Sequence, residues 1–216
     1  MSESGRYVPA LGRDPLTALY DPVVKLMTRE RAFKERLLAQ AGLAAGMDVL
    51  DLACGTGTLA VWAKERAPGA RIAGIDGDPK MVERARAKAR TAGLDIRFDE
   101  GVSFALPYPD ASFDRVLTTL LFHHLVDRDK ERTIGEIARV LREDGELHVA
   151  DWGPPADPLM AAASMTIRVL DGFEPTRANF KGELPGLFER GGLGRATRTD
   201  QLRTVTGTLA LYAVAR

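Results

Sequence analysis

The chain has 216 residues, of which 45% are hydrophobic, and its 30 basic side chains balance 30 acidic ones. This length fits a single α/β domain, and the zero net charge gives no whole-chain electrostatic reason to expect nucleic acid as a partner. The single cysteine, Cys54, excludes an internal disulfide. Without a signal-peptide pattern or an apolar run of about 20 residues, the chain is expected to be soluble and cytoplasmic.

Apolar runs typical of buried strands alternate with segments of helical spacing along the chain. Such alternation indicates βαβ units, and it therefore predicts a Rossmann-like, doubly wound and mostly parallel sheet. The expected strands are 47–53, 71–76, 96–98, 113–119 and 146–151, and the expected helices are 58–67, 79–92 and 129–141.

The remaining segments are expected to complete one domain over residues 1–216. Residues 1–45, helical over 29–43, would form a lid in front of a cofactor-binding core at 46–153. Residues 154–190 mix helical stretches with turns and are expected to be an insert facing the substrate. Within 191–216, two strands at 196–203 and 205–214 predict a terminal antiparallel hairpin on the parallel sheet.

A glycine-rich turn follows the first predicted strand and leads directly into a helix, in the sequence VLDLACGTGTLA from Val49 to Ala60. Gly55 and Gly57 would let the backbone approach a ligand closely, and the helix N-terminus offers free N–H groups. The turn also satisfies the dinucleotide fingerprint, with Asp76 at the end of the next strand in the position of a ribose-binding acid. These features predict a nucleoside cofactor without choosing one.

Asp51 lies inside the first strand and narrows that choice. A turn that binds NAD has no need of an acid at this place, whereas a cofactor carrying an ammonium group does, because a carboxylate offsets its charge.

Five motifs follow one another along the chain: VLDLACGTGTLA, GIDGDPKMVERA, ALPYPD with SFD, LLFHHL, and RVLREDG with HVADWG. In this order they resemble the motifs of the class I S-adenosylmethionine-dependent methyltransferases, and the closest similarity is to the branch of the ubiquinone and menaquinone C-methyltransferases. This resemblance implies a seven-stranded sheet whose last strand is antiparallel, and S-adenosylmethionine as the cofactor.

The resemblance also assigns roles by position. Gly55 and Gly57 would pass the methionyl part, with Asp51 near its amino group, while Asp76 would hold the ribose hydroxyls and Met81 would pack on the adenine. Tyr20 would close over the sulfonium. The complete set of expected cofactor contacts is Tyr20, Asp51, Ala53, Gly55, Thr56, Gly57, Asp76, Gly77, Met81, Val102, Ser103, Thr118 and His123.

Two of these positions depart from the family pattern on the adenine side. Val102 stands where an aspartate often reaches the adenine amino group, and Gly77 stands where a larger apolar residue often covers the ring. One lost hydrogen bond costs about 0.5–1.5 kcal/mol, which would weaken binding about tenfold. Asp99 or Glu100 are candidates to replace it.

His123 and His124 are the candidate catalytic residues, as general bases toward an acceptor. Their adjacency in a helix would point them about 100° apart, and without a third ligand at suitable spacing no metal site is expected. Asp151 is expected either to orient a base or to hydrogen-bond backbone at its strand end. His148 and Cys54 are interpreted as packed structural residues.

Polar residues of the insert, Arg168, Arg177 and Asn179, are candidates to meet a polar substrate. The sequence thus predicts methyl transfer from S-adenosylmethionine to a small-molecule acceptor by in-line displacement. Two alternatives stay open. A non-catalytic methyltransferase-like binding protein would explain Val102 and Gly77, and a nicotinamide-dependent oxidoreductase would explain the literal fingerprint.

Overall fold

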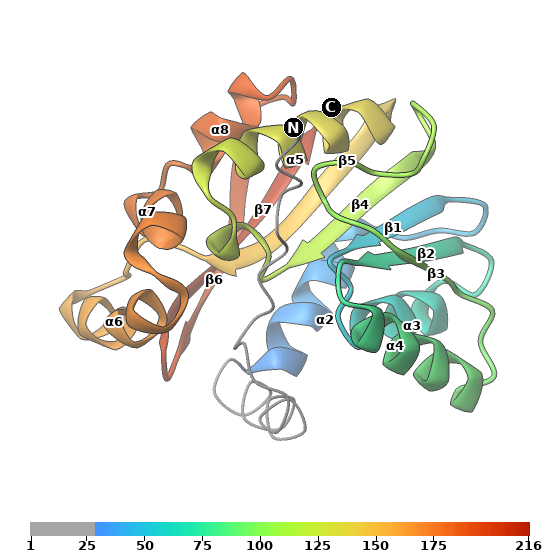
Figure 1. Cartoon of the computed structure of the whole chain (residues 1–216), viewed down its shortest axis with the longest axis horizontal. Coiled ribbons are helices and arrows are strands. Elements are labelled where there is room, and N and C mark those ends of the chain that lie inside the picture. Colours follow the sequence, from blue (N-terminus) through green and yellow to red (C-terminus); the bar gives the residue numbers. More distant parts are fainter. Residues whose placement is uncertain (1–28) are drawn as a thin grey trace, which may run out of the picture.

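The computed structural model describes residues 29–216, which form one seven-stranded sheet with helices on both faces (Figure 1). The strand order is β3-β2-β1-β4-β5-β7-β6, and β7 is antiparallel to both of its neighbours. The strands are β1 Asp48–Leu52, β2 Arg71–Asp76, β3 Arg97–Glu100, β4 Phe113–Thr119, β5 Leu141–Trp152, β6 Ala196–Thr204 and β7 Gly207–Ala215.

Two layers of helices enclose the sheet and create two apolar cores. On one face, α2, α3 and α4 bury side chains such as Phe33, Leu59 and Val82 against the strands, and on the other α5 and α8 bury Ile134 and Phe188. The helices are α2 Glu30–Ala41, α3 Thr58–Arg66, α4 Pro79–Thr91, α5 Asp127–Val140, α6 Pro158–Asp171, α7 Phe173–Lys181 and α8 Leu184–Arg190, with a short 3-10 helix at Phe122–His124.

The parallel strands end together at one edge of the sheet, and β1 and β4 lie side by side there although β2 and β3 separate them in sequence. Leu52 at the end of β1 pairs with Thr118 near the end of β4. Open α/β sheets bind their ligands in the crevice at such a switch point of the strand order. The fold therefore directs attention to the turns that follow β1, β2, β4 and β5.

The predicted Rossmann-like sheet and its antiparallel hairpin are confirmed, and most boundaries agree within a few residues. The largest difference is β5, which begins at Leu141 where residue 146 was expected. Leu141 pairs with Phe113 and Glu146 pairs with Arg115, so the residues between Leu141 and Glu146 form a bulge in β5. The strand therefore starts directly where α5 ends, and Gly145 lies within the bulge.

The described part of the predicted N-terminal lid is helix α2, which belongs to one of the helix layers on the sheet. Helix α2 packs on the face formed by β4, β5 and β7, and it buries Phe33, Leu37 and Leu38 there. The rest of the expected lid, including Tyr20, lies outside the described residues, so its covering role stays a prediction. Within residues 29–216, no helix has both the length and the apolar composition to cross a membrane.

Candidate functional site

The turn after β1 is bent by three residues in the left-handed region. Ala53, Gly55 and Gly57 have φ values of 57°, 53° and 73°. A non-glycine residue held in this region costs about 1–3 kcal/mol and is found mainly at functional sites, where the surroundings enforce it. The turn positions the N-terminus of α3 at the carboxyl edge of the sheet.

The two glycines of this turn have different surroundings. A Cβ added at Gly57 would lie 2.7 Å from Cβ of Ala85 on α4, so Gly57 is needed for packing of the turn against that helix. A Cβ added at Gly55 would meet nothing within 4 Å. The space above Gly55 is therefore open, as a backbone cradle for a ligand requires.

Asp76 at the end of β2 links the two turns at this edge. Its Oδ2 accepts a hydrogen bond from Gly55 N at 2.8 Å, and its Oδ1 accepts one from Asp78 N at 3.0 Å. Burial raises the pKa of Asp76, although these backbone N–H groups oppose the rise. The carboxylate retains acceptor lone pairs for hydroxyl groups of a ligand.

Asp51 lies beneath the turn and is 1% exposed. Its Oδ2 accepts a hydrogen bond from Ala60 N, in the first turn of α3, at 3.0 Å. Burial raises its pKa to about 7, with Lys34 on α2 partly opposing that rise. A buried carboxyl group poised near neutral pH gains its charge most easily when a cation comes close, as an ammonium group would.

Val102 and Gly77, the two departures from the family pattern, are half-buried at this edge, and their effect on adenine binding stays a prediction. The two acids expected to replace the missing aspartate have partners within the protein. Asp99 accepts a hydrogen bond from the Tyr108 hydroxyl at 2.9 Å and pairs with Arg97 at 2.8 Å. Glu100, exposed at the end of β3, lies 3.9 Å from Arg86.

The other expected cofactor contacts are distributed around the same turns. Ser103 hydrogen-bonds Thr133 of α5 at 2.8 Å, and Thr56 accepts a hydrogen bond from Lys88. Met81 is half-buried in the first turn of α4. Thr118 is fully buried, and its hydroxyl donates to Leu52 O at 2.9 Å, so this side chain ties β4 to β1.

The turn after β4 carries both candidate catalytic residues on its 3-10 helix. Leu120, another non-glycine residue with a left-handed φ of 56°, directs the chain into that helix. His123 is 3% exposed, and its Nδ1 lies 2.7 Å from Oδ1 of Asp151 at the end of β5.

Asp151 combines the two roles that the sequence left open. Its Oδ2 accepts the N–H of Phe122 at 2.7 Å, and its Oδ1 accepts the N–H of Trp152 at 2.7 Å as well as facing His123. Burial alone would raise the pKa of Asp151, but His123 and the two N–H groups hold it below the usual value. The charged carboxylate therefore fixes the orientation of the His123 ring.

Two arguments made from sequence about the histidines are wrong. The rings of His123 and His124 lie 3.9 Å apart between centroids, inclined by 40°, so they do not diverge as residues of an ideal α-helix would. A third potential ligand is also present, because Asp171 at the end of α6 faces both rings. The sequence does not reveal Asp171 as a candidate ligand, because it lies far from the histidines along the chain and only the packing of α6 brings it next to them.

His148 and Cys54, expected to be packed structural residues, are both buried. His148 is 1% exposed and Cys54 is 7% exposed, which confirms both as packed residues. Burial lowers the pKa of His148 to about 4 and raises that of the Cys54 thiol.

The polar candidates of the insert have partners within the protein. The Arg177 guanidinium pairs with Asp127 and Glu183, and that of Arg168 lies 4.7 Å from the ring centroid of Phe173. Asn179 is fully buried, and its Nδ2 donates to Trp152 O at 3.1 Å. Their contact with a substrate remains a prediction.

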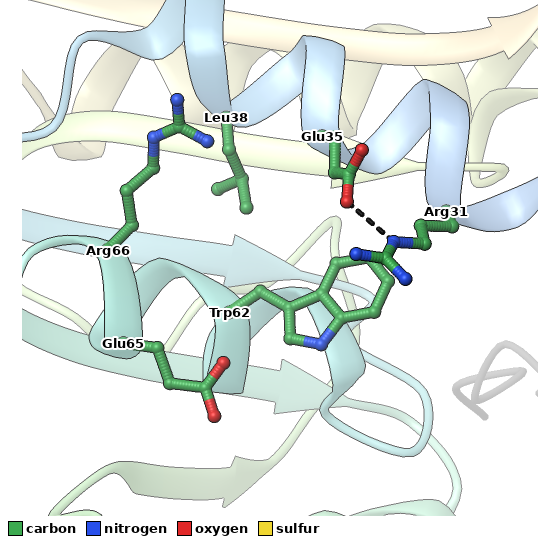
Figure 2. A pocket seen from close by; sticks show the side chains of 6 residues that line it. All are labelled: Arg31, Glu35, Leu38, Trp62, Glu65 and Arg66. Carbon is green, nitrogen blue, oxygen red and sulfur yellow. Dashed lines mark hydrogen bonds and ion pairs between the residues drawn. The ribbon is translucent and has the colours of Figure 1, made fainter.

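A surface hollow lies between α2 and α3, apart from the turns described above (Figure 2). An ion pair of 2.7 Å between Arg31 and Glu35 borders it. None of the predicted site residues within 29–216 lines this hollow, whose walls are formed by Arg31, Glu35, Leu38, Trp62, Glu65 and Arg66. We therefore assign the functional site to the carboxyl edge of the sheet.

Comparison with known proteins shows what the chain is similar to. Residues 49–145 match a family described as a methyltransferase domain. A demethylmenaquinone methyltransferase of Thermus thermophilus is 47% identical over 107 residues, which are 50% of this chain and 48% of that protein. A 27-O-demethylrifamycin SV methyltransferase of Amycolatopsis mediterranei is 39% identical over 120 residues, 55% of this chain and 43% of that protein.

A solved structure has the same fold. The SAM-dependent methyltransferase of Aquifex aeolicus superposes with a TM-score of 0.68 at 22% identity, over 94% of this chain and 100% of that one. In this chain the antiparallel strand β7 lies between β5 and β6, so the strand order differs from the order 3-2-1-4-5-6 of dinucleotide-binding sheets.

Residues 49–145 are thus similar to methyltransferase domains, and the fold is similar to that of a SAM-dependent methyltransferase. Demethylmenaquinone methyltransferases are among the similar proteins, in agreement with the sequence motifs. The chain spans about half the length of the curated relatives that it matches.

The different surroundings of the two glycines predict different effects of alanine. Gly57→Ala combines a left-handed φ with the Ala85 clash and should lower the free energy of unfolding by about 2–5 kcal/mol. Gly55→Ala carries the φ penalty alone, about 1–2 kcal/mol, while its methyl group occupies the open cradle. Urea denaturation of both variants measures this difference, and equal losses would contradict it.

The raised pKa of Asp51 predicts a specific pH dependence of stability. Because the folded state holds this proton up to about pH 7, stability decreases as pH rises from the unfolded pKa through the folded one. Between about pH 5 and about pH 8 the wild type should lose on the order of 2–3 kcal/mol more than Asp51→Asn. Denaturant unfolding at both pH values tests this, and parallel curves would refute it.

Proposed function

We propose that this chain transfers a methyl group from S-adenosylmethionine to a small-molecule acceptor at the carboxyl edge of β1, β2, β4 and β5. The observation that carries the proposal is the turn after β1, where the open space at Gly55 lies between Asp51 beneath the turn and Asp76 beside it. The match of residues 49–145 to a methyltransferase-domain family and the relatives named as methyltransferases support the same conclusion.

The residues present fit this cofactor. Its amino group would be held by Asp51, its ribose hydroxyls by Asp76, and its methionyl part would pass over the backbone of Gly55 and near Thr118 and His123. When bound, S-adenosylmethionine supplies a methyl group that is already activated on a sulfonium. The protein therefore has to align the acceptor and exclude water, and alignment alone can contribute about 7–11 kcal/mol.

For the acceptor, the proposal places its reacting atom beside His123. Asp151 holds Nδ1 of this ring, so Nε2 is the nitrogen left for an acceptor proton in a protein without metal. The side chain of His124 is one-third exposed, and its ring lies next to that of His123. Helix α7 packs directly on the 3-10 helix of the histidines, which supports α6 and α7 as the substrate-facing part of residues 154–190.

The acceptor class is a small organic molecule with an ionisable hydroxyl or an activated carbon. The relatives support both kinds of reaction, because one is named for demethylmenaquinone and another for an O-demethylated rifamycin. The proposal includes no nucleic acid. A non-catalytic binding protein would bind S-adenosylmethionine without turning it over, and a nicotinamide-dependent oxidoreductase would bind NAD instead.

Cofactor choice is tested by thermal unfolding with S-adenosylhomocysteine or NAD. A ligand that binds only the folded state at 100 times its dissociation constant adds about 2.7 kcal/mol, roughly 5–11 °C for this length. We expect that shift with S-adenosylhomocysteine alone, and its loss in Gly55→Ala. A shift with NAD alone would overturn the proposal.

Catalysis by the histidines is tested in the metal-free protein by the rate of S-adenosylhomocysteine formation with phenolic and quinol acceptors. His123→Ala should lower kcat by about 10²–10⁴-fold, since a positioned base contributes that much. His124→Ala should have a smaller effect, because Asp151 orients only the neighbouring ring. Wild-type kcat in His123→Ala would remove this residue from the chemistry, and S-adenosylhomocysteine binding without any turnover would favour the binding-only alternative.

A further inference from the structure

We propose that His123, His124 and Asp171 bind a divalent transition-metal ion beside the cofactor turn. Nε2 of His123 lies 3.6 Å from Oδ2 of Asp171, and Nδ1 of His124 lies 3.8 Å from its Oδ1. One ligand atom from each of the three residues lies within 4.8 Å of the others. Tetrahedral ligands at about 2.0–2.2 Å from an ion are separated by about 3.3–3.6 Å, so small side-chain rotations complete the site.

The first ligand is already prepared for a metal by its neighbour. Asp151, which is fully buried, faces Nδ1 of His123 at 2.7 Å and leaves Nε2 directed toward Asp171. Metal-binding histidines commonly use their second nitrogen in this way, because a carboxylate partner fixes the tautomer and the ring orientation. The arrangement thus presents a neutral imidazole nitrogen to the ion.

Burial and charge at the cluster agree with a cation. His123 is 3% exposed, whereas the side chains of Asp171 and His124 are 21% and 33% exposed, so an ion would be shielded from water by His123 and accessible beside His124. Asp151 faces the His123 ring, and Asp171 faces both rings. The ammonium of Lys130, whose charge acts on His124, donates to the carbonyl oxygens of Leu125 and Pro175.

The donor set selects the class of metal. Two imidazole nitrogens and one carboxylate suit Zn²⁺, Co²⁺, Ni²⁺ or Fe²⁺, whereas Mg²⁺ and Ca²⁺ prefer oxygen ligands throughout. Three protein ligands also leave at least one coordination position open, as in catalytic sites.

A consequence for catalysis rests on the proposed function. An acceptor hydroxyl bound at the open position would lose its proton to solvent more easily, because the ion lowers the pKa of a bound oxygen. The freed electron pair on that oxygen would then form the new bond to the methyl group, while the methyl–sulfur bond breaks and its electron pair stays on the sulfur of S-adenosylhomocysteine. In the metal-loaded protein, Nε2 of His123 therefore binds the ion instead of accepting the proton.

Metal binding is measured without any substrate, so the test is independent of methyl transfer. The full chain, free of purification tags and stripped with a chelator, is titrated with Co²⁺ while its visible absorption is followed. We expect saturation at about one ion per chain with the intense bands of a four- or five-coordinate site, and displacement of Co²⁺ by Zn²⁺. No absorption change, or bands of the hexaaqua ion alone, would overturn the proposal.

Variants assign the ligands. His124→Ala and Asp171→Asn should abolish the bands, and Asp151→Asn should weaken binding by about 10–100-fold, as loss of an outer carboxylate typically does. Asp129→Asn, a matched change on α5 whose carboxylate faces Arg132, should bind like the wild type. Unchanged bands in Asp171→Asn would also overturn the site. An unaltered melting temperature in each variant shows that its fold is intact.

Discussion

The site depends on the switch point of the sheet, where β1 and β4 are neighbours but the chain segments that follow them run in different directions. The hydroxyl of Thr118 on β4 donates a hydrogen bond to Leu52 O on β1 and so holds the two strands together. After β1 the chain turns through left-handed residues into α3, and after β4 it passes Leu120 into the histidine 3-10 helix. The turn after β1 and the histidines of the 3-10 helix, to which we assign the cofactor and the acceptor, therefore lie at one edge.

Carboxyl groups at the ends of the strands organise this edge. Asp51 accepts the N–H of Ala60, Asp76 accepts that of Gly55, and Asp151 accepts those of Phe122 and Trp152. Each carboxylate thus stabilises a turn that the backbone alone would not hold, while keeping acceptor capacity for a ligand or a histidine. The same groups serve the fold and the proposed chemistry, which explains why buried acids are tolerated here.

Much of the cofactor side could be predicted from the sequence because its determinants are local. The run from Val49 to Ala60 contains the strand, the turn and the helix start within twelve positions, and Asp76 follows at the end of the next strand. The strand–helix alternation likewise predicted the sheet and its terminal hairpin, since hydrophobic period and turn residues are properties of neighbouring positions.

The acceptor side could not be predicted in the same way. Asp171 reaches the histidines only through the packing of α6, and no spacing in the sequence relates it to His123. The argument that adjacent histidines diverge considered only the rotation of the backbone. A 3-10 helix rotates the chain by about 120° per residue, so it is the orientation of the two side chains, both facing Asp171 of α6, that brings the rings together. The contacts of Asp99 with Tyr108 and of Ser103 with Thr133 likewise depend on the tertiary fold, so the sequence pattern does not predict them.

In the proposed complex, S-adenosylmethionine binds over the turn after β1 with its ammonium group next to Asp51. Calorimetric titration with S-adenosylhomocysteine near neutral pH, in buffers of different ionisation enthalpy, tests this directly by counting the protons exchanged on binding. The account predicts that the wild type binds and releases more protons than Asp51→Asn, because the ligand draws Asp51 into its charged form. Equal proton exchange in the two proteins, or no binding by the wild type, would contradict it.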